Sequence, residues 1–183
     1  MHLECKDRNV LIEYMPKGMI WAELGVFKGE FSDIILKQAD PKVIHLVDTW
    51  EGRWVNGGKD GDYDEWIDDM SLMYHKLKEK YSSDERVVLW RNKTEDFFDK
   101  VRIVLPIKAL DAVYIDALHT YEDVKRDLND AYAVTKRYIL GHDYNIDRFP
   151  GCVKAVDEFC RHNDLKITHL TEDGCPTYLI PLQ

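Results

Sequence analysis

Acidic and imidazole side chains follow two apolar runs in the second half of the sequence. The run Val113-Tyr114-Ile115 is followed by Asp116 and, three positions later, by His119. A second apolar run ends on His142 and Asp143. Carboxylate and imidazole groups can ligate a divalent cation, and histidine has the near-neutral pKa that a general base requires. Each histidine alone is as readily a hydrogen-bonded structural residue, but the four together favour a metal site with a base beside it.

A glycine-containing turn with acidic neighbours lies earlier in the chain. The sequence "AELGVFKGEFS" (22–32) has the pattern E-x-G-x-x-x-G, with Glu23 before the turn and Glu30 after it. A pyrophosphate favours a fuller G-x-G-x-x-G turn without nearby negative charge. The sulfonium and ammonium groups of S-adenosylmethionine are better suited to acidic neighbours. A turn this short also has a purely structural interpretation.

Two further polar segments fit an adenosine ligand. Asp48 closes an apolar run 25 positions after Glu23. An acid at that place can accept the ribose hydroxyls of NAD or of S-adenosylmethionine, so Asp48 does not choose between them. An aspartate at a strand end also commonly caps a turn. Residues 92–95 follow a third run and are candidates for adenine contacts.

Short apolar runs alternate with longer amphipathic segments along the whole chain. This alternation predicts an α/β fold, a doubly wound sheet that is mostly parallel with one antiparallel strand near the C-terminus. Ligands of such sheets bind beyond the carboxyl ends of the strands, where all the polar residues above are expected. The predicted strands are 19–24, 42–48, 86–90, 111–116, 137–143 and two within 166–181; the predicted helices are 30–39, 63–81, 94–101, 121–135 and 151–163.

Turn and capping residues complete this outline. Thr94 and Thr120 are expected to cap the helices that follow them. Residues 51–62 are rich in glycine and charge, and with Trp50 and Trp54 they form a candidate lid or acceptor-binding segment. The same segment can also be a solvated connection. His45, inside a predicted strand, is expected to be a core histidine.

The length and net charge of the chain indicate a single domain and argue against some classes of binding partner. A chain of 183 residues fits one domain, so we expect a single domain over 1–183. The balance of 25 basic and 34 acidic side chains gives a net charge of −9, which argues against general nucleic-acid or anionic-membrane binding. No apolar run approaches the ~20 residues that span a bilayer, and the N-terminus lacks a signal peptide's apolar segment. The four cysteines lack zinc-site spacing, so we expect reduced thiols in a cytoplasmic protein.

Four segments together resemble class I S-adenosylmethionine-dependent methyltransferases. They are "AELGVFKGEFS", "HLVDTWEG", "VYIDALHTYEDVKRDL" and "ILGHDYNIDRFPGCVKAVDEF", and the similarity covers about residues 19–160. The sequence is most similar to the branch that contains the macrocin and mycinamicin sugar O-methyltransferases. The block D-x-x-H-x-Y-E-x-V-x-x-D-L is the most specific part of this resemblance.

The resemblance implies a Rossmann-like sheet of seven strands and a role for each polar position. The histidine matching His119 would be the base that removes a proton from a small-molecule hydroxyl, such as that of a sugar or natural product. His142 stands where the sugar enzymes carry a carboxylate, so the metal site would hold magnesium weakly or favour manganese or a similar ion. The expected cofactor-binding residues are Glu23, Gly25, Phe27, Gly29, Asp48, Thr49, Thr94 and Asp116, and the expected metal ligands are Asp116, His142 and Asp143.

Two other functions remain compatible with the sequence. A non-catalytic domain that binds an adenosyl ligand or a protein could share the fold, and the replacement of a carboxylate by His142 leaves this open. An NAD-dependent oxidoreductase is disfavoured by the missing third glycine and by Glu23. The sequence leaves open the identity of the acceptor and whether the chain forms a homo-oligomer.

Overall fold

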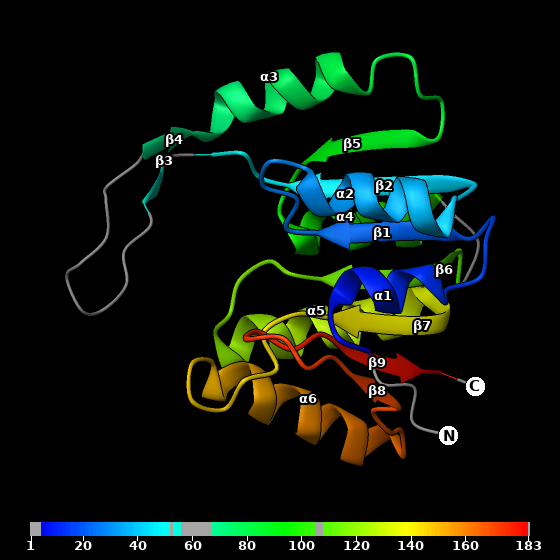
Figure 1. Cartoon of the computed structure of the whole chain (residues 1–183), viewed down its shortest axis with the longest axis vertical. Helices are drawn as coiled ribbons and strands as arrows, with labels where there is room; N and C mark the ends of the chain where they lie inside the picture. Colours follow the sequence, from blue (N-terminus) through cyan, green and yellow to red (C-terminus); the bar gives the residue numbers. More distant parts are fainter. Residues whose placement is uncertain (1–4, 52, 56–66, 105–107, 183) are drawn as a thin grey trace.

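A computed structural model of the chain describes residues 5–51, 53–55, 67–104 and 108–182 (Figure 1). The strands of its main sheet are β1 (Ile20–Leu24), β2 (Val43–Asp48), β5 (Val87–Arg91), β6 (Leu110–Ile115), β7 (Thr135–Gly141), β8 (His169–Leu170) and β9 (Tyr178–Pro181). They have the order β5-β2-β1-β6-β7-β9-β8. Strands β5 to β7 in this order are parallel, and β9 is antiparallel to both of its neighbours. The predicted doubly wound, mostly parallel sheet is therefore confirmed.

Helices cover both faces of the sheet and complete three layers (Figure 1). One apolar cluster joins the sheet to α1, α2, η1 and α3, and a second cluster joins it to α4, α5 and α6. The alternation of side chains along β1 separates the two clusters, since Trp21 belongs to the first and Ala22 and Leu24 to the second. The bounds are α1 (Arg8–Glu13), α2 (Glu30–Ile34), the π-helix η1 (Ile35–Ala39), α3 (Met70–Lys80), α4 (Thr94–Val104), α5 (Tyr121–Val134) and α6 (Pro150–Asn163).

The predicted helix 63–81 and the predicted loop 51–62 both need correction. The helix, α3, begins only at Met70, because the preceding residues pair as a short antiparallel hairpin of β3 (Arg53–Val55) and β4 (Ile67–Asp69). Asp69 then accepts hydrogen bonds from the backbone N–H groups of Ser71 and Leu72 and caps α3. Residues 56–66, which hold the glycines of the candidate lid, lie outside the described part of the chain.

Two smaller predictions about local structure have different outcomes. Thr120 caps α5 as expected, since its hydroxyl accepts a hydrogen bond from the Asp123 N–H. The prediction that Thr94 caps a helix is wrong, because Thr94 is the first residue of α4 and its hydroxyl donates instead to Asp127 on α5, at 2.7 Å. The side chain of Thr94 therefore joins two helices.

Buried polar and sulfur-containing side chains of the core match the sequence-based expectations. His45 is a core residue, 8% exposed, and its Nδ1 accepts a hydrogen bond from the Trp90 indole at 3.0 Å. All four cysteines are free thiols. Among the described helices, none is long and apolar enough to cross a membrane.

The second apolar cluster offers a direct test of the packing. Phe97 on α4 is fully buried and its ring contacts those of His45, Trp90 and Phe98, with centroids 5.3–5.9 Å apart. Phe97→Ala should lower the free energy of unfolding by about 3–5 kcal/mol, because it removes buried surface and leaves a cavity. Urea denaturation followed by circular dichroism measures the change.

The matched control lies on the same helix. Ile103 is 83% exposed, so Ile103→Ala should change the free energy of unfolding by less than about 0.5 kcal/mol. Equal losses for the Phe97 and Ile103 variants would contradict this assignment of the two faces of α4.

Candidate functional site

The turn after β1 is pressed against the end of β6. Gly25 has a φ of +84°, and a Cβ at this position would lie 1.9 Å from the carbonyl oxygen of Asp116. Two backbone hydrogen bonds flank this contact. The Gly25 N–H donates to the Val47 carbonyl of β2, and the Asp116 N–H donates to the Leu24 carbonyl of β1. Only glycine fits here, so the ends of β1, β2 and β6 are fixed against one another.

The carboxylate of Asp48, at the end of β2, organises two turns. Its Oδ2 accepts hydrogen bonds from the N–H groups of Val26 and Phe27 at 3.0 and 2.9 Å. Its Oδ1 accepts one from the N–H of Trp50 at 2.9 Å, and the Trp50 indole donates to the Phe27 carbonyl. Phe27 and Trp50 both have positive φ angles, +52° and +42°, which bulky residues adopt only when their surroundings impose them.

Glu23 is a buried acid beneath the same turn. It is 2% exposed, and its Oε2 accepts a hydrogen bond from the Ser32 hydroxyl at 2.6 Å. Burial is the main cause that raises the pKa of Glu23 to about 8, and the negative charge of Asp116 adds to it. In the absence of a ligand, this side chain therefore carries a proton at neutral pH.

A cavity of about 810 Å³ lies along this edge of the sheet. Its size is that of a small-molecule site. One predicted cofactor residue, Gly29, does not line the cavity: it caps α2 with a φ of +73° and faces Leu77 of α3 and Tyr81, the residue after that helix. The predicted residues that do line the cavity are Glu23, Gly25, Phe27, Asp48, Thr49, Thr94, Asp116 and His119.

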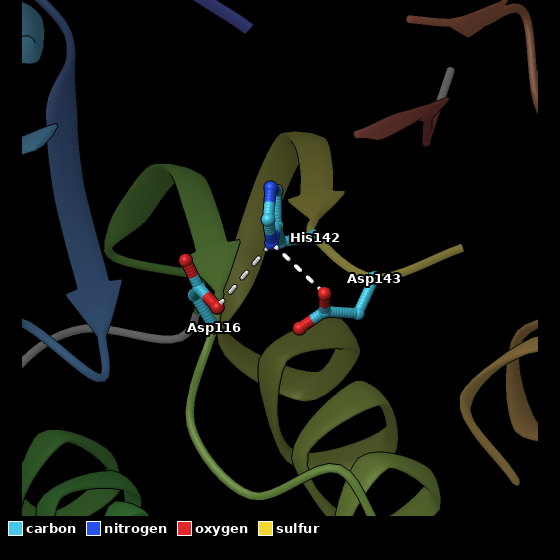
Figure 2. Close-up of side chains that lie close together, drawn as sticks. All are labelled: Asp116, His142 and Asp143. Atoms are coloured by element: carbon cyan, nitrogen blue, oxygen red, sulfur yellow. Dashed lines mark ion pairs between the residues drawn. The ribbon is translucent and has the colours of Figure 1, made fainter. Parts of the chain in front are cut away.

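The ends of β6 and β7 bring the predicted metal ligands together. Asp116, His142 and Asp143 each offer one ligand atom within 4.8 Å of the others, and Figure 2 shows the three side chains converging. The Nδ1 of His142 lies 3.2 Å from Asp143 Oδ1 and 3.7 Å from Asp116 Oδ1. Asp143 has a positive φ of +62°, so a left-handed turn directs its carboxylate toward its neighbours.

His119, in the loop before α5, lies beside the predicted metal ligands Asp116 and Asp143. Its Nε2 lies 2.6 Å from Asp143 Oδ2 and 3.8 Å from Asp116 Oδ1. The nearby carboxylates of Asp116 and Asp143 raise the pKa of His119 to about 9, and the two histidines keep the pKa of Asp143 below its usual range despite its burial. The imidazolium therefore supplies the positive charge that two adjacent carboxylates need at neutral pH.

Two residues of this edge were not predicted as site residues. Arg8 of α1 lines the cavity and forms an ion pair with Asp116, its Nη1 being 3.2 Å from Oδ2. Asp127 of α5 also lines the cavity, is 1% exposed and accepts the Thr94 hydrogen bond. The only sequence signal for Arg8 was the preceding Asp7, a good N-cap residue, while Asp127 belongs to the D-x-x-H-x-Y-E-x-V-x-x-D-L block.

The sequence matches the model of a known protein family. A model of a methyltransferase domain matches residues 22–144, more than half of the chain. The chain belongs to the methyltransferase domain family. The matched segment begins within β1 and ends one residue after Asp143, so it includes the turn at Gly25 and the cluster in Figure 2. Among curated proteins, none matches the sequence.

Solved structures share the fold of this methyltransferase domain at low sequence identity. A candidate rRNA methylase from Clostridium thermocellum has a TM-score of 0.65 at 13% identity, over 99% of this chain and 97% of the other. A candidate S-adenosylmethionine-dependent methyltransferase from Streptococcus mutans has a TM-score of 0.66 at 12% identity, over 96% and 47%. Precorrin-6y C5,15-methyltransferase from Geobacter metallireducens has a TM-score of 0.59 at 9% identity, over 96% and 85%. At these low identities the similarities establish the fold and do not identify the methyl acceptor.

Two glycines with similar backbone angles allow the contact at Gly25 to be tested. Gly18 has a φ of +71°, but a Cβ added there would meet no atom within 4 Å, so Gly18→Ala should cost only the backbone strain, about 1–2 kcal/mol. Gly25→Ala should cost roughly 1–3 kcal/mol more, because the Cβ overlaps the Asp116 carbonyl. Urea denaturation of both variants measures the difference, and equal costs would contradict the close contact.

The protonation of Glu23 predicts how stability depends on pH. The pKa of Glu23 is raised to about 8 in the folded protein, whereas an unfolded chain has a value near 4.5. Since the folded state then binds the extra proton, this stabilising contribution is complete below pH ~4.5 and is lost as the pH rises through about 8. Wild type should lose stability over this interval relative to Glu23→Gln, as measured by urea denaturation at a series of pH values.

The exposed residue Glu85 supplies the control for this experiment. Glu85→Gln should follow the wild-type pH profile, because replacing this exposed side chain leaves the buried acid in place. If Glu23→Gln shows the same slope as wild type, Glu23 is not the group that takes up the proton.

Proposed function

We propose that this methyltransferase domain transfers the methyl group of S-adenosylmethionine to a hydroxyl group of a small molecule. The observation that supports it is the cavity that joins the acidic exits of β1, β2 and β6 to His119. The acids suit a cationic cofactor without phosphates. His119 lines the same cavity and lies 2.6 Å from Asp143, one of the predicted metal ligands, where a base for the acceptor hydroxyl would stand.

The adenosyl part of the cofactor would lie along the exits of β1, β2 and β5. Asp48 would accept a ribose hydroxyl, but three backbone N–H groups already occupy most of its about four acceptor positions. We therefore assign Asp48 one ribose hydroxyl rather than two. Phe27, Thr49 and Thr94 would line the remainder of this part of the cavity.

His119 would act as the base in the methyl transfer. The acceptor O–H would give its proton to Nε2 while the oxygen attacks the methyl carbon and the sulfur–carbon bond breaks, which releases S-adenosylhomocysteine. With a pKa of about 9, His119 must first lose the proton that it shares with the two carboxylates. Alignment of the three atoms should supply most of the rate gain, and the base about 10²–10⁴-fold.

The donor set of Asp116, His142 and Asp143 fits a divalent cation. Two carboxylates and one imidazole within 4.8 Å of one another suit manganese or a similar ion better than magnesium, which prefers oxygen ligands. Such an ion, when bound, would hold the acceptor oxygen and lower the pKa of its hydroxyl. Asp116 and Asp143 would then release His119 from its role as their counter-charge.

Cofactor choice is tested by isothermal titration with S-adenosylmethionine, S-adenosylhomocysteine and NAD. Binding of both adenosyl ligands and not of NAD is expected. Binding of NAD alone would refute the proposal in favour of an oxidoreductase.

Turnover is tested by transfer of a labelled methyl group to a panel of sugars and other hydroxyl compounds, with rRNA and tRNA as further acceptors. Each assay is run with magnesium, with manganese and with a chelator. We expect transfer to a small hydroxyl compound, and His119→Ala should lower kcat by about 10²–10⁴-fold while changing the cofactor Kd less than about twofold. His162→Ala, at an exposed position of α6, is the control and should match wild type.

The other outcomes separate the alternatives. Transfer to RNA alone would replace the small-molecule acceptor by a nucleic acid. Cofactor binding without transfer to any acceptor would favour a non-catalytic domain. Full activity in chelator, unchanged by Asp143→Ala, would remove the metal from the proposal.

A further inference from the structure

The N-terminal helix α1 places a guanidinium group at the edge of the cavity. Asp7 caps this helix by accepting hydrogen bonds from the N–H groups of Asn9 and Val10, and Leu11 and Ile12 anchor it in the first apolar cluster. Arg8 is its first residue. The helix is thereby fixed so that the Arg8 side chain reaches the carboxyl ends of β1 and β6.

Arg8 uses only part of its hydrogen-bonding capacity within the described part of the chain. Nη1 lies 3.2 Å from Asp116 Oδ2 and 3.4 Å from the Tyr114 hydroxyl. The guanidinium carbon stacks 4.4 Å above the centroid of the Phe31 ring, which holds the group flat. Nε and Nη2 form no hydrogen bond to a described residue, although the side chain is only 31% exposed and lines the cavity. Two parallel N–H donors thus remain for a ligand.

The charges beside Arg8 have the pattern that an amino-acid zwitterion requires. Glu23 and Asp116 lie close enough to act on its pKa, so two carboxyl groups and one guanidinium share this end of the cavity. An ammonium group would meet the two carboxyl groups and favour the ionised form of Glu23, and a carboxylate would meet the arginine. A planar guanidinium binds a carboxylate through two parallel hydrogen bonds, which a point charge cannot do.

Three other cations line the cavity, and one of them, Lys28, lies over the Phe27 ring in the turn after β1, 5.0 Å from the ring centroid. Arg126 is engaged by Asp123 at 2.8 Å and lies near Glu95, on α5 and α4. Lys93 lies beside these residues at the start of α4 and pairs with Glu95. Both belong to the end of the cavity assigned to the adenosine, so neither is placed to meet the carboxylate of the methionyl group.

We propose that Arg8 binds the carboxylate of the methionyl part of S-adenosylmethionine through Nε and Nη2, while Nη1 stays on Asp116. This inference rests on the proposed function and assigns one subsite within it. Arg8 makes the protein select cofactors that carry an intact amino-acid group. A competing role is purely structural: the ion pair with Asp116 would only hold α1 against the sheet.

A comparison of two ligands and two proteins separates these roles. S-adenosylmethionine and its decarboxylated form, S-adenosylmethioninamine, share the adenosine, sulfonium and ammonium groups and differ in the carboxylate. Arg8→Met keeps a long apolar stem on Phe31 and removes the guanidinium. Isothermal titration gives the dissociation constants of both ligands for each protein, and thermal unfolding shows that each protein is folded. Arg137→Met, at an exposed position of β7, is the control.

Wild type and the control should prefer S-adenosylmethionine by roughly tenfold to a hundredfold, the usual effect of a charge-assisted hydrogen-bonded pair. Arg8→Met should reduce this preference to less than about threefold by weakening S-adenosylmethionine alone. If Arg8→Met weakens both ligands equally, or if wild type does not distinguish them, the inference is wrong while the proposed function stands. If wild type binds neither ligand, the proposed function itself fails.

Arg8→Lys keeps the test decisive if the methionine variant does not fold. Lysine retains the positive charge near Asp116 but cannot offer two parallel N–H groups to a carboxylate. The preference for S-adenosylmethionine should therefore fall by about tenfold. An unchanged preference would overturn the assignment of Arg8 as the carboxylate ligand.

Discussion

The carboxylate of Asp48 is the contact on which the shape of the cavity depends. It accepts hydrogen bonds from three backbone N–H groups in two turns. Both turns contain a bulky residue with a left-handed backbone conformation, Phe27 or Trp50, which is unfavourable without such hydrogen bonds. These hydrogen bonds join the end of β2 to the turn after β1. A ligand at this edge would therefore meet a wall that is already formed, and less of its binding free energy would be lost in ordering the protein.

Each acid near the neighbouring strand ends is balanced in a different way. Glu23 is balanced by a proton, Asp116 by the guanidinium of Arg8, and Asp143 by the imidazole groups of His119 and His142. Carboxylates this close to one another, and partly buried, would otherwise disfavour the folded state. All of these balancing charges can be exchanged for those of a ligand or an ion, so the arrangement that stabilises the folded protein also prepares this edge for binding.

The order of strands and helices was predictable because hydrophobic periodicity is a local property of the sequence. The approach of Asp116, His119 and Asp143 was also predictable, since parallel strands end at one edge of the sheet. Arg8 was not, because a helix of six residues has too few positions to show a period and its side chain acts on a residue more than a hundred positions away. The orientation of Gly29 toward α3 depends on tertiary packing, which the glycine pattern does not encode.

The close contact of Gly25 with the Asp116 carbonyl has a mechanical consequence. With no space for even one additional carbon atom, β1 and β6 cannot slide along each other at this edge without breaking the backbone hydrogen bonds that flank the contact. Sliding of the two halves of the sheet past each other is thus disfavoured as a way of admitting a ligand. Any conformational change that accompanies ligand binding would then occur at the periphery, around a rigid centre of the sheet.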